Sequence, residues 1–129
     1  MNRKTLGAND WVVIKLEGEI DLAKADELAR IRATARGRTQ NLVIDLSPVT
    51  FMDSTGLRWI LETYREAVDA QREMRVVVPS GGQLQRLLAI GGAEAVLTIY
   101  DSLDEALQPV RTMSTAKAGP KDILWTTGS

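Results

Sequence analysis

Residues 41–68 read NLVIDLSPVTFMDSTGLRWILETYREAV, and this stretch joins a short apolar strand to the most clearly amphipathic helix of the chain. The strand is expected over residues 41–46, where Asp45 interrupts the apolar run and Pro48 prevents any extension. The helix is expected to begin at Ser54 or Thr55, because the apolar residues that follow recur at spacings of three and four. These residues are Leu57, Ile60, Leu61, Tyr64, Ala67 and Val68. A strand leading into such a helix is the repeating unit of an α/β fold.

Further strands and helices alternate on both sides of this unit. The other expected elements are strands over residues 11–17, 75–78 and 96–100 and helices over residues 21–36, 84–90 and 102–107. Asp21 is a good N-cap, and Ser102 with Glu105 forms a capping box. Strand and helix alternate four times, which predicts an α/β fold with a mainly parallel sheet and four helices. The sheet has four strands, or five if residues 2–6 add an edge strand.

The periodic pattern also predicts the extent of the domain. One domain is expected over residues 1–110, which is an ordinary domain length. From Arg111 onward the periodicity stops, and Ser, Thr, Gly, Lys and Pro dominate. Residues 111–129 are therefore expected to form a mobile C-terminal tail, although Ile123-Leu124-Trp125 could instead dock on the domain or on a partner.

The composition excludes several classes of function. The 129 residues include 16 Lys and Arg against 17 Asp and Glu, and a net charge of −1 gives no strong attraction to nucleic acid. The chain contains no cysteine and no histidine, which removes thiolate nucleophiles, cysteine-based metal sites and the usual proton shuttle. We therefore expect no metal site, no cofactor and no enzyme activity.

The distribution of apolar residues bears on location. No apolar run approaches the roughly 18 residues that a membrane span needs. Residues 1–10 are polar and lack the apolar core of a signal peptide. We expect a cytoplasmic protein without membrane insertion.

The segment Phe51-Met52-Asp53-Ser54-Thr55-Gly56-Leu57 is the candidate functional site. A helix that begins here leaves several backbone N–H groups without partners and carries partial positive charge, which favours an anion. Ser54 could cap this helix with its hydroxyl or carry a phosphate, and Asp53 could act as the cap instead. Gly56 leaves the first turn uncrowded. Spacing alone does not distinguish a capping serine from a phosphorylated one.

Three other segments are weaker candidates for a functional site. Asp45 at a strand end suggests a phospho-aspartate receiver, but no lysine follows the last strand at Tyr100-Asp101-Ser102. The segment over residues 79–83 lacks the spacing of a phosphate-binding loop and is interpreted as a turn. Glu19 and Asp21 lie two residues apart on a turn and need no catalytic explanation.

Three groups of residues resemble the consecutive signatures of the STAS family, the domains shared by sulphate transporters and anti-sigma factor antagonists. They are Gly18-Glu19-Ile20-Asp21, Asp45-Leu46 and residues 51–57. Arg86-Leu87-Leu88, Gly92 and residues 102–107 follow in the spacing of that family. The resemblance covers residues 11–108, and it implies a STAS fold, a mainly parallel sheet with four helices.

For a free-standing chain, the resemblance implies an anti-sigma factor antagonist that regulates transcription. Unmodified, such a protein sequesters an anti-sigma factor that is also a serine kinase, and thereby releases the sigma factor. The kinase phosphorylates the serine after the aspartate, which is Ser54 here, and a serine phosphatase reverses this. Some relatives use threonine, so Thr55 is the alternative acceptor.

The phosphorylation site has four expected neighbours. The resemblance implies Asp21 and Asp53, whereas Gly56 and Arg58 are expected because they follow Ser54 within about one helical turn. Arg58 could pair with a phosphate on Ser54, although small residues are common at its position in the family. The expected partner-binding residues are Asp21, Lys24, Asp53, Ser54, Thr55, Leu57 and Arg58.

Two other binding roles fit the same family. One is a scaffold subunit of a stress-sensing complex, and the other is an accessory subunit of an ABC transporter. The kinase-regulated antagonist is favoured because Asp53, Ser54, Gly56 and Leu57 occur together. A small-molecule enzyme is disfavoured by the absence of histidine, cysteine and a phosphate-binding loop.

Overall fold

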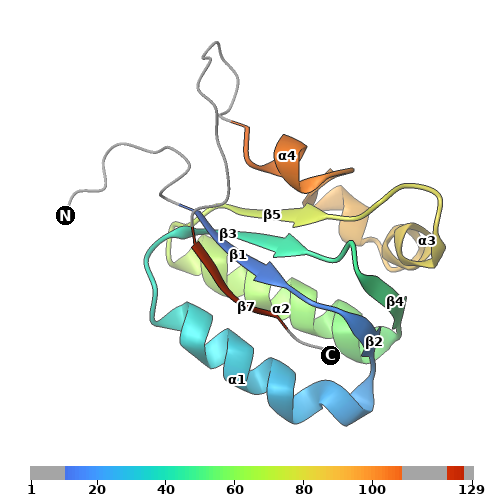
Figure 1. Cartoon of the computed structure of the whole chain (residues 1–129), viewed down its shortest axis with the longest axis horizontal. Helices are drawn as coiled ribbons and strands as arrows, with labels where there is room; N and C mark the ends of the chain where they lie inside the picture. The colour runs from blue at the N-terminus through green and yellow to red at the C-terminus, as the bar shows by residue number, and fades with distance from the viewer. Residues whose placement is uncertain (1–10, 109–121, 127–129) are drawn as a thin grey trace.

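The main sheet contains five parallel strands in the spatial order β6-β5-β3-β1-β7. Figure 1 shows β5, β3, β1 and β7 side by side in this order. The computed structural model describes residues 11–108 and the backbone of residues 122–126. The strands are β1 (Trp11–Lys15), β3 (Asn41–Asp45), β5 (Met74–Val77), β6 (Thr98–Tyr100) and β7 (Asp122–Thr126). The predicted α/β fold with a mainly parallel sheet is confirmed.

Helices cover the two faces of this sheet unequally. The described residues form α1 (Ala25–Arg36), α2 (Ser54–Asp69), α3 (Gln83–Ile90) and α4 (Leu103–Ala106), with the short 3₁₀ turns η2 (Leu22–Lys24) and η3 (Ala93–Ala95). Val12 and Ile14 of β1 pack in one core cluster with residues of α1, α2 and α3, whereas Trp11 and Val13 pack with α4. Successive side chains of a strand point to opposite faces. Thus α1, α2 and α3 cover one face and α4 the other, as Figure 1 shows for α1, α2 and α4.

A second, two-stranded sheet is the main element that the sequence did not predict. It pairs β2 (Gly18–Ile20) with β4 (Val49–Met52) in parallel, where only turns and connections were expected. The strands have three and four residues, too few for an alternating pattern to stand out. Gly18 has a φ of 76°, which glycine adopts freely, so β2 starts directly at the turn that the sequence indicates.

The fifth strand of the main sheet, β7, lies within the expected C-terminal tail. It pairs in parallel with β1, with a register irregularity between Val13 and Ile14. This is the docking alternative that the sequence left open for residues 123–125. The edge strand expected over residues 2–6 lies outside the described residues, as do residues 109–121 and 127–129. The domain boundary at residue 110 and the mobility of the tail therefore stay predictions.

The helices α1 and α2 are joined by a buried tryptophan. Trp59 of α2 is only 5% exposed, and its Nε1–H donates to the carbonyl oxygen of Leu28 in α1 at 2.8 Å. Thr63, one turn later, is also buried, and its hydroxyl donates to the carbonyl oxygen of Trp59 at 2.7 Å. The Trp59 hydrogen bond therefore joins the two helices, and the Thr63 bond satisfies a buried hydroxyl within α2.

A buried arginine holds α4 on the opposite face of the sheet. The Arg75 guanidinium lies 4.3 Å from the centre of the Trp11 ring and pairs with Glu73 at 3.0 Å. Its Nη1 donates to the carbonyl oxygens of Ala106 and Gln108 at 2.7 and 2.8 Å. A cation at the carbonyl end of a helix is electrostatically favourable, so Arg75 anchors the end of α4.

Gly56 lies in the first turn of α2, where the helix passes directly over Met52. A Cβ at Gly56 would stand 2.5 Å from Met52 Cγ, and Met52 is itself buried. A Cβ at Gly91, after α3, would stand 2.6 Å from Leu57 Cδ2. The two glycines thus allow β4, α2 and α3 to approach closely, which fixes the position of the start of α2.

The close approach at Gly56 leads to a stability prediction. Gly56→Ala is expected to lower the free energy of unfolding by about 1–3 kcal/mol, because the added methyl group overpacks the site of the buried Met52 side chain. Gly37→Ala is the matched control, since Gly37 follows α1 with a φ of −82° and its added Cβ would stand 3.5 Å from the nearest atom. Urea unfolding should place the control within about 0.5 kcal/mol of the wild type. Equal stabilities of the two variants would contradict the close contact of α2 with Met52.

Candidate functional site

Two aspartates lie at the same edge of the small sheet, each directly after a strand. Ile20 of β2 and Met52 of β4 are partners in the parallel register, and Asp21 and Asp53 are the next residues along the two chains. The Asp53 N–H donates to the carbonyl oxygen of Ile20 at 3.2 Å, so the pairing continues as far as the aspartates. The pairing of β2 with β4 therefore places two of the predicted site residues beside each other.

Each aspartate caps the helix that follows it. Asp53 Oδ1 accepts a hydrogen bond from the Thr55 N–H at 2.8 Å at the start of α2. Asp21 Oδ1 accepts one from the Ala23 N–H at 3.1 Å at the start of η2. Of the two caps that the sequence allowed for α2, the structure uses Asp53.

Ser54 is the first residue of α2, and its side chain is exposed. Within residues 11–108, neither its hydroxyl nor its N–H has a hydrogen-bond partner. The start of a helix carries partial positive charge, so an anion attached to Ser54 would be stabilised there. The arrangement leaves an accessible hydroxyl that can accept a phosphoryl group.

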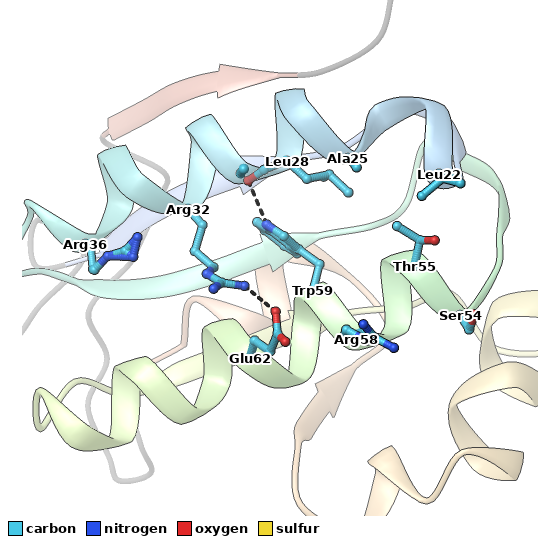
Figure 2. Close-up of a pocket in the computed structure, with 11 residues that line it drawn as sticks. Leu22, Ala25, Leu28, Arg32, Arg36, Ser54, Thr55, Arg58, Trp59 and Glu62 are labelled. Atoms are coloured by element: carbon cyan, nitrogen blue, oxygen red, sulfur yellow. Dashed lines mark hydrogen bonds and ion pairs between the residues drawn. The ribbon is translucent and has the colours of Figure 1, made fainter.

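Thr55 differs from Ser54 in orientation. Figure 2 shows the Thr55 side chain pointing towards α1 and Leu22, whereas Ser54 points away from α1. Thr55 is half-buried, and its N–H is already bonded to Asp53. Of the two hydroxyls, that of Ser54 is therefore the more accessible to another protein.

A groove of about 530 Å³ runs between α1 and α2 and ends at Ser54 and Thr55 (Figure 2). Its apolar lining includes the buried Leu28 and Trp59, and Leu22 stands at its edge with 73% of its surface exposed. The full lining consists of Leu22, Ala25, Leu28, Ala29, Arg32, Arg36, Ser54, Thr55, Arg58, Trp59 and Glu62.

Apart from Arg58, the sequence did not identify the charged residues in and beside this groove. Arg32 Nη1 lies 2.6 Å from Glu62 Oε1, and Arg32 Nε lies 3.3 Å from Glu66 Oε2. Arg36 also reaches Glu66, at 3.5 Å. The signal that could have found them is the spacing of four between the two arginines and between the two glutamates, which aligns each pair on one helix face.

Arg58 is exposed and follows Ser54 by one helical turn. In the part of the chain that the structure describes, its guanidinium takes part in no ion pair and no hydrogen bond. With Ser54 and Glu62 it lines both the groove and a second depression of about 390 Å³, whose lining residues all belong to α2. Arg58 is thus an uncompensated cation beside the candidate phosphorylation site.

Two other predicted partner-binding residues contribute to local structure. The Lys24 ammonium donates from Nζ to the carbonyl oxygen of Glu19 at 3.0 Å, which ties the end of η2 to β2. Leu57 is half-buried and packs over Gly91 at the end of α3. Both residues lie within one turn of a capping aspartate in sequence.

The weaker candidates have structural explanations. Asp45 is buried, and its Oδ1 accepts from the N–H and the hydroxyl of Ser47 at 3.0 and 2.7 Å, as a turn residue does. In the turn over residues 79–83, the Gly81 N–H donates to the side chain of Gln85 at 2.6 Å. Among residues 11–108 and 122–126, no group of His, Cys, Asp and Glu could hold a metal ion, and no helix could span a membrane.

Comparisons with known proteins agree with the observed fold. A family model described as "STAS domain" matches residues 2–106. The "Anti-sigma F factor antagonist" of Paenibacillus polymyxa is 30% identical over 105 residues, which cover 80% of this chain and 89% of that protein. A Thermotoga maritima protein named as a candidate anti-sigma factor antagonist has the same fold, with a TM-score of 0.71 and 21% identity, over 83% of this chain and 92% of that one. The Bacillus cell fate determinant SpoIIAA in its phosphorylated form matches with a TM-score of 0.58 and 21% identity, over 79% and 92% of the two chains.

The capping geometry leads to a prediction that separates Asp53 from Ser54. Asp53→Ala is expected to lower the free energy of unfolding by about 1 kcal/mol, because the Thr55 N–H loses its acceptor. Ser54→Ala, the matched control on the neighbouring residue, is expected to stay within about 0.5 kcal/mol of the wild type. Both values can be measured by urea unfolding. A larger loss for Ser54→Ala than for Asp53→Ala would assign the cap to the serine instead.

Proposed function

This chain belongs to the STAS domain family, and on that premise we propose that it acts as an anti-sigma factor antagonist. The unmodified protein binds an anti-sigma factor that is also a serine kinase, and this frees a sigma factor for transcription. Phosphorylation of Ser54 ends the binding, and a serine phosphatase restores it. The protein acts by binding and not by catalysis, needs no metal or cofactor, and works in the cytoplasm, where these partners are found.

The observation that carries the proposal is the free Ser54 hydroxyl at the start of α2. Asp53 caps the helix, so phosphorylation of the serine hydroxyl would break no hydrogen bond that stabilises the start of α2. The exposed side chain is accessible to a kinase and to a phosphatase. Thr55, which is half-buried and directed towards Leu22, is the less accessible alternative (Figure 2).

A phosphate at Ser54 can control binding without unfolding the domain. It adds about 1.5–2 negative charges, and the start of the helix stabilises them by about 0.3–1 kcal/mol. An acidic group of the partner about 4 Å away would meet repulsion of about 4 kcal/mol at an effective dielectric constant of 20. At about 1.4 kcal/mol per tenfold change, that repulsion corresponds to a loss of affinity of roughly a thousandfold.

The surroundings of Ser54 have the mixed character of a protein-binding surface. Leu22 is 73% exposed and Phe51 is 42% exposed, and each lies within two residues of a capping aspartate. Exposed apolar side chains rimmed by charged groups are typical of docking sites. On this surface character and on the resemblance to the STAS family, we assign partner binding to Asp21, Lys24, Asp53, Ser54, Thr55, Leu57 and Arg58.

The binding switch can be tested by titration. The purified chain is titrated with the purified anti-sigma factors of its source organism, with and without ATP. Ser54→Ala should bind with an affinity close to that of the wild type and stay insensitive to ATP, whereas Ser54→Asp should bind at least about tenfold more weakly. Mass spectrometry of the wild-type mixture should place the phosphate on Ser54, and Thr55→Ala should still be phosphorylated.

Several results would contradict the proposed function. Equal affinities of the wild type, Ser54→Ala and Ser54→Asp would show that the site does not control binding. A phosphate on Thr55 would move the switch by one residue. Binding to none of the anti-sigma factors, with capture of a multimeric STAS assembly or of a transporter ATPase instead, would favour the scaffold or the transporter-subunit role.

A further inference from the structure

Arg58 lies in the middle of a ridge along α2. Ser54 precedes it by one helical turn and Glu62 follows it by one turn, and all three residues line the depressions on both sides. Residues four apart on a helix are direct neighbours on its surface. The two positions that could supply Arg58 with a negative charge from its own helix are therefore Glu62 and, once phosphorylated, Ser54.

Glu62 is already engaged across the groove. Its Oε1 lies 2.6 Å from Arg32 Nη1, and Figure 2 shows this pair bridging α1 and α2 while Arg58 lies apart from it. Arg32 is also held by Glu66 at 3.3 Å, so the pair belongs to a small network. Because Glu62 is paired with Arg32, Arg58 has no ion pair among the described residues, although this glutamate lies one turn away on the same helix.

The charge of the groove favours an acidic occupant. Three arginines, at positions 32, 36 and 58, line it against the glutamate at position 62. Glu66 pairs with two of these arginines from outside the lining, which leaves one positive charge in excess. Arg36 keeps 51% of its side chain exposed despite its contact with Glu66. A partner segment that places a carboxylate beside Arg58 and apolar side chains over Trp59 would complement both the charge and the apolar lining.

We propose that Arg58 binds a carboxylate of the docking protein when Ser54 is unmodified, and that the phosphate on Ser54 captures the same guanidinium when the serine is phosphorylated. The inference rests on the proposed function and adds a specific group for which the two anions compete. Guanidinium groups bind carboxylates and phosphates through the same forked set of donors, so both anions suit the same residue.

The competition favours the phosphate for two reasons. The phosphate carries about 1.5–2 negative charges against one for a carboxylate, and it offers three acceptor oxygens. It is also attached one turn away on the same helix, so its pairing with Arg58 needs no association of two molecules. The partner carboxylate then loses its cation and meets a like charge, and one modification produces both effects.

The intramolecular pair can be tested without any partner. The chain is prepared with phosphoserine at position 54, and the phosphate is titrated by ³¹P NMR. Arg58→Ala should raise the pKa of the second phosphate ionisation by about 0.3–0.5, because the paired guanidinium favours the dianion. Arg65→Ala is the matched control: Arg65 is exposed on the same helix, has no ion pair within the described residues, and lies about 10 Å further along the axis. Equal pKa values in the Arg58→Ala and Arg65→Ala variants would overturn the capture of Arg58 by the phosphate.

The competition itself is tested by a double-mutant cycle with the anti-sigma factor that binds the wild type. Arg58→Ala alone should weaken binding of the unmodified chain at least about fivefold, whereas Arg65→Ala should change it less than twofold. Ser54→Asp should weaken binding at least about threefold less in the Arg58→Ala background than in the wild type, because the shared cation is already absent. Native-like circular dichroism of all variants shows that the changes do not come from unfolding.

The outcomes separate this inference from the proposed function. If Ser54→Asp weakens binding equally with and without Arg58, the shared-cation proposal is wrong while the switch at Ser54 stands. If Ser54→Asp has no effect in the wild type, the switch itself is wrong, and the ³¹P titration still decides whether the phosphate pairs with Arg58. A loss of affinity in Arg65→Ala as large as that in Arg58→Ala would assign the effect to general surface charge.

Discussion

The hydrogen bond from the Thr55 N–H to the Asp53 carboxylate is the constraint on which the candidate site depends. It satisfies one of the N–H groups that have no partner within the helix at its start. The residue that caps the helix is thus Asp53, directly before the serine. Had Ser54 been the cap, its hydroxyl would face the backbone, and modifying it would remove support from α2. With Asp53 as the cap, the serine stands at the same positively polarised helix end with no internal partner among the described residues. The helix cap and the proposed phosphorylation site are thus two adjacent residues.

The small sheet sets where this cap lies. Asp21 and Asp53 are 32 positions apart in the chain, and only the register of β2 with β4 makes them neighbours. The buried Met52, which a Cβ on Gly56 would approach to 2.5 Å, then fixes how closely α2 passes over β4. The cap geometry therefore depends on contacts that bury apolar side chains. A partner that recognises the two aspartates recognises the correctly paired sheet as well as two charges.

The sequence predicted the parts of the fold that depend on local pattern. The course of α2 follows from apolar residues at spacings of three and four, and the strand over residues 41–46 follows from its apolar run before Pro48. The candidate serine and its neighbouring aspartate also form a local signal. The β2–β4 pairing and the Arg32–Glu62 ion pair could not be predicted in this way, because each joins segments about 30 residues apart. The position of β7 on β1 has the same cause, since an edge strand is chosen by the whole sheet.

The two sides of α2 explain how the proposed modification of Ser54 would control binding while the fold stays unchanged. One side buries Trp59 and Thr63 in hydrogen bonds that hold the helix to α1 and to itself. The other side carries Ser54 and Arg58 in solvent, where a new charge meets no buried group. The core side is close-packed, and its buried Trp59 and Thr63 side chains are hydrogen-bonded. A surface ion pair contributes only about 1 kcal/mol, which is too little to rearrange this packing. A phosphate at Ser54 would therefore change the charges that the groove presents to another protein and leave the fold as it is.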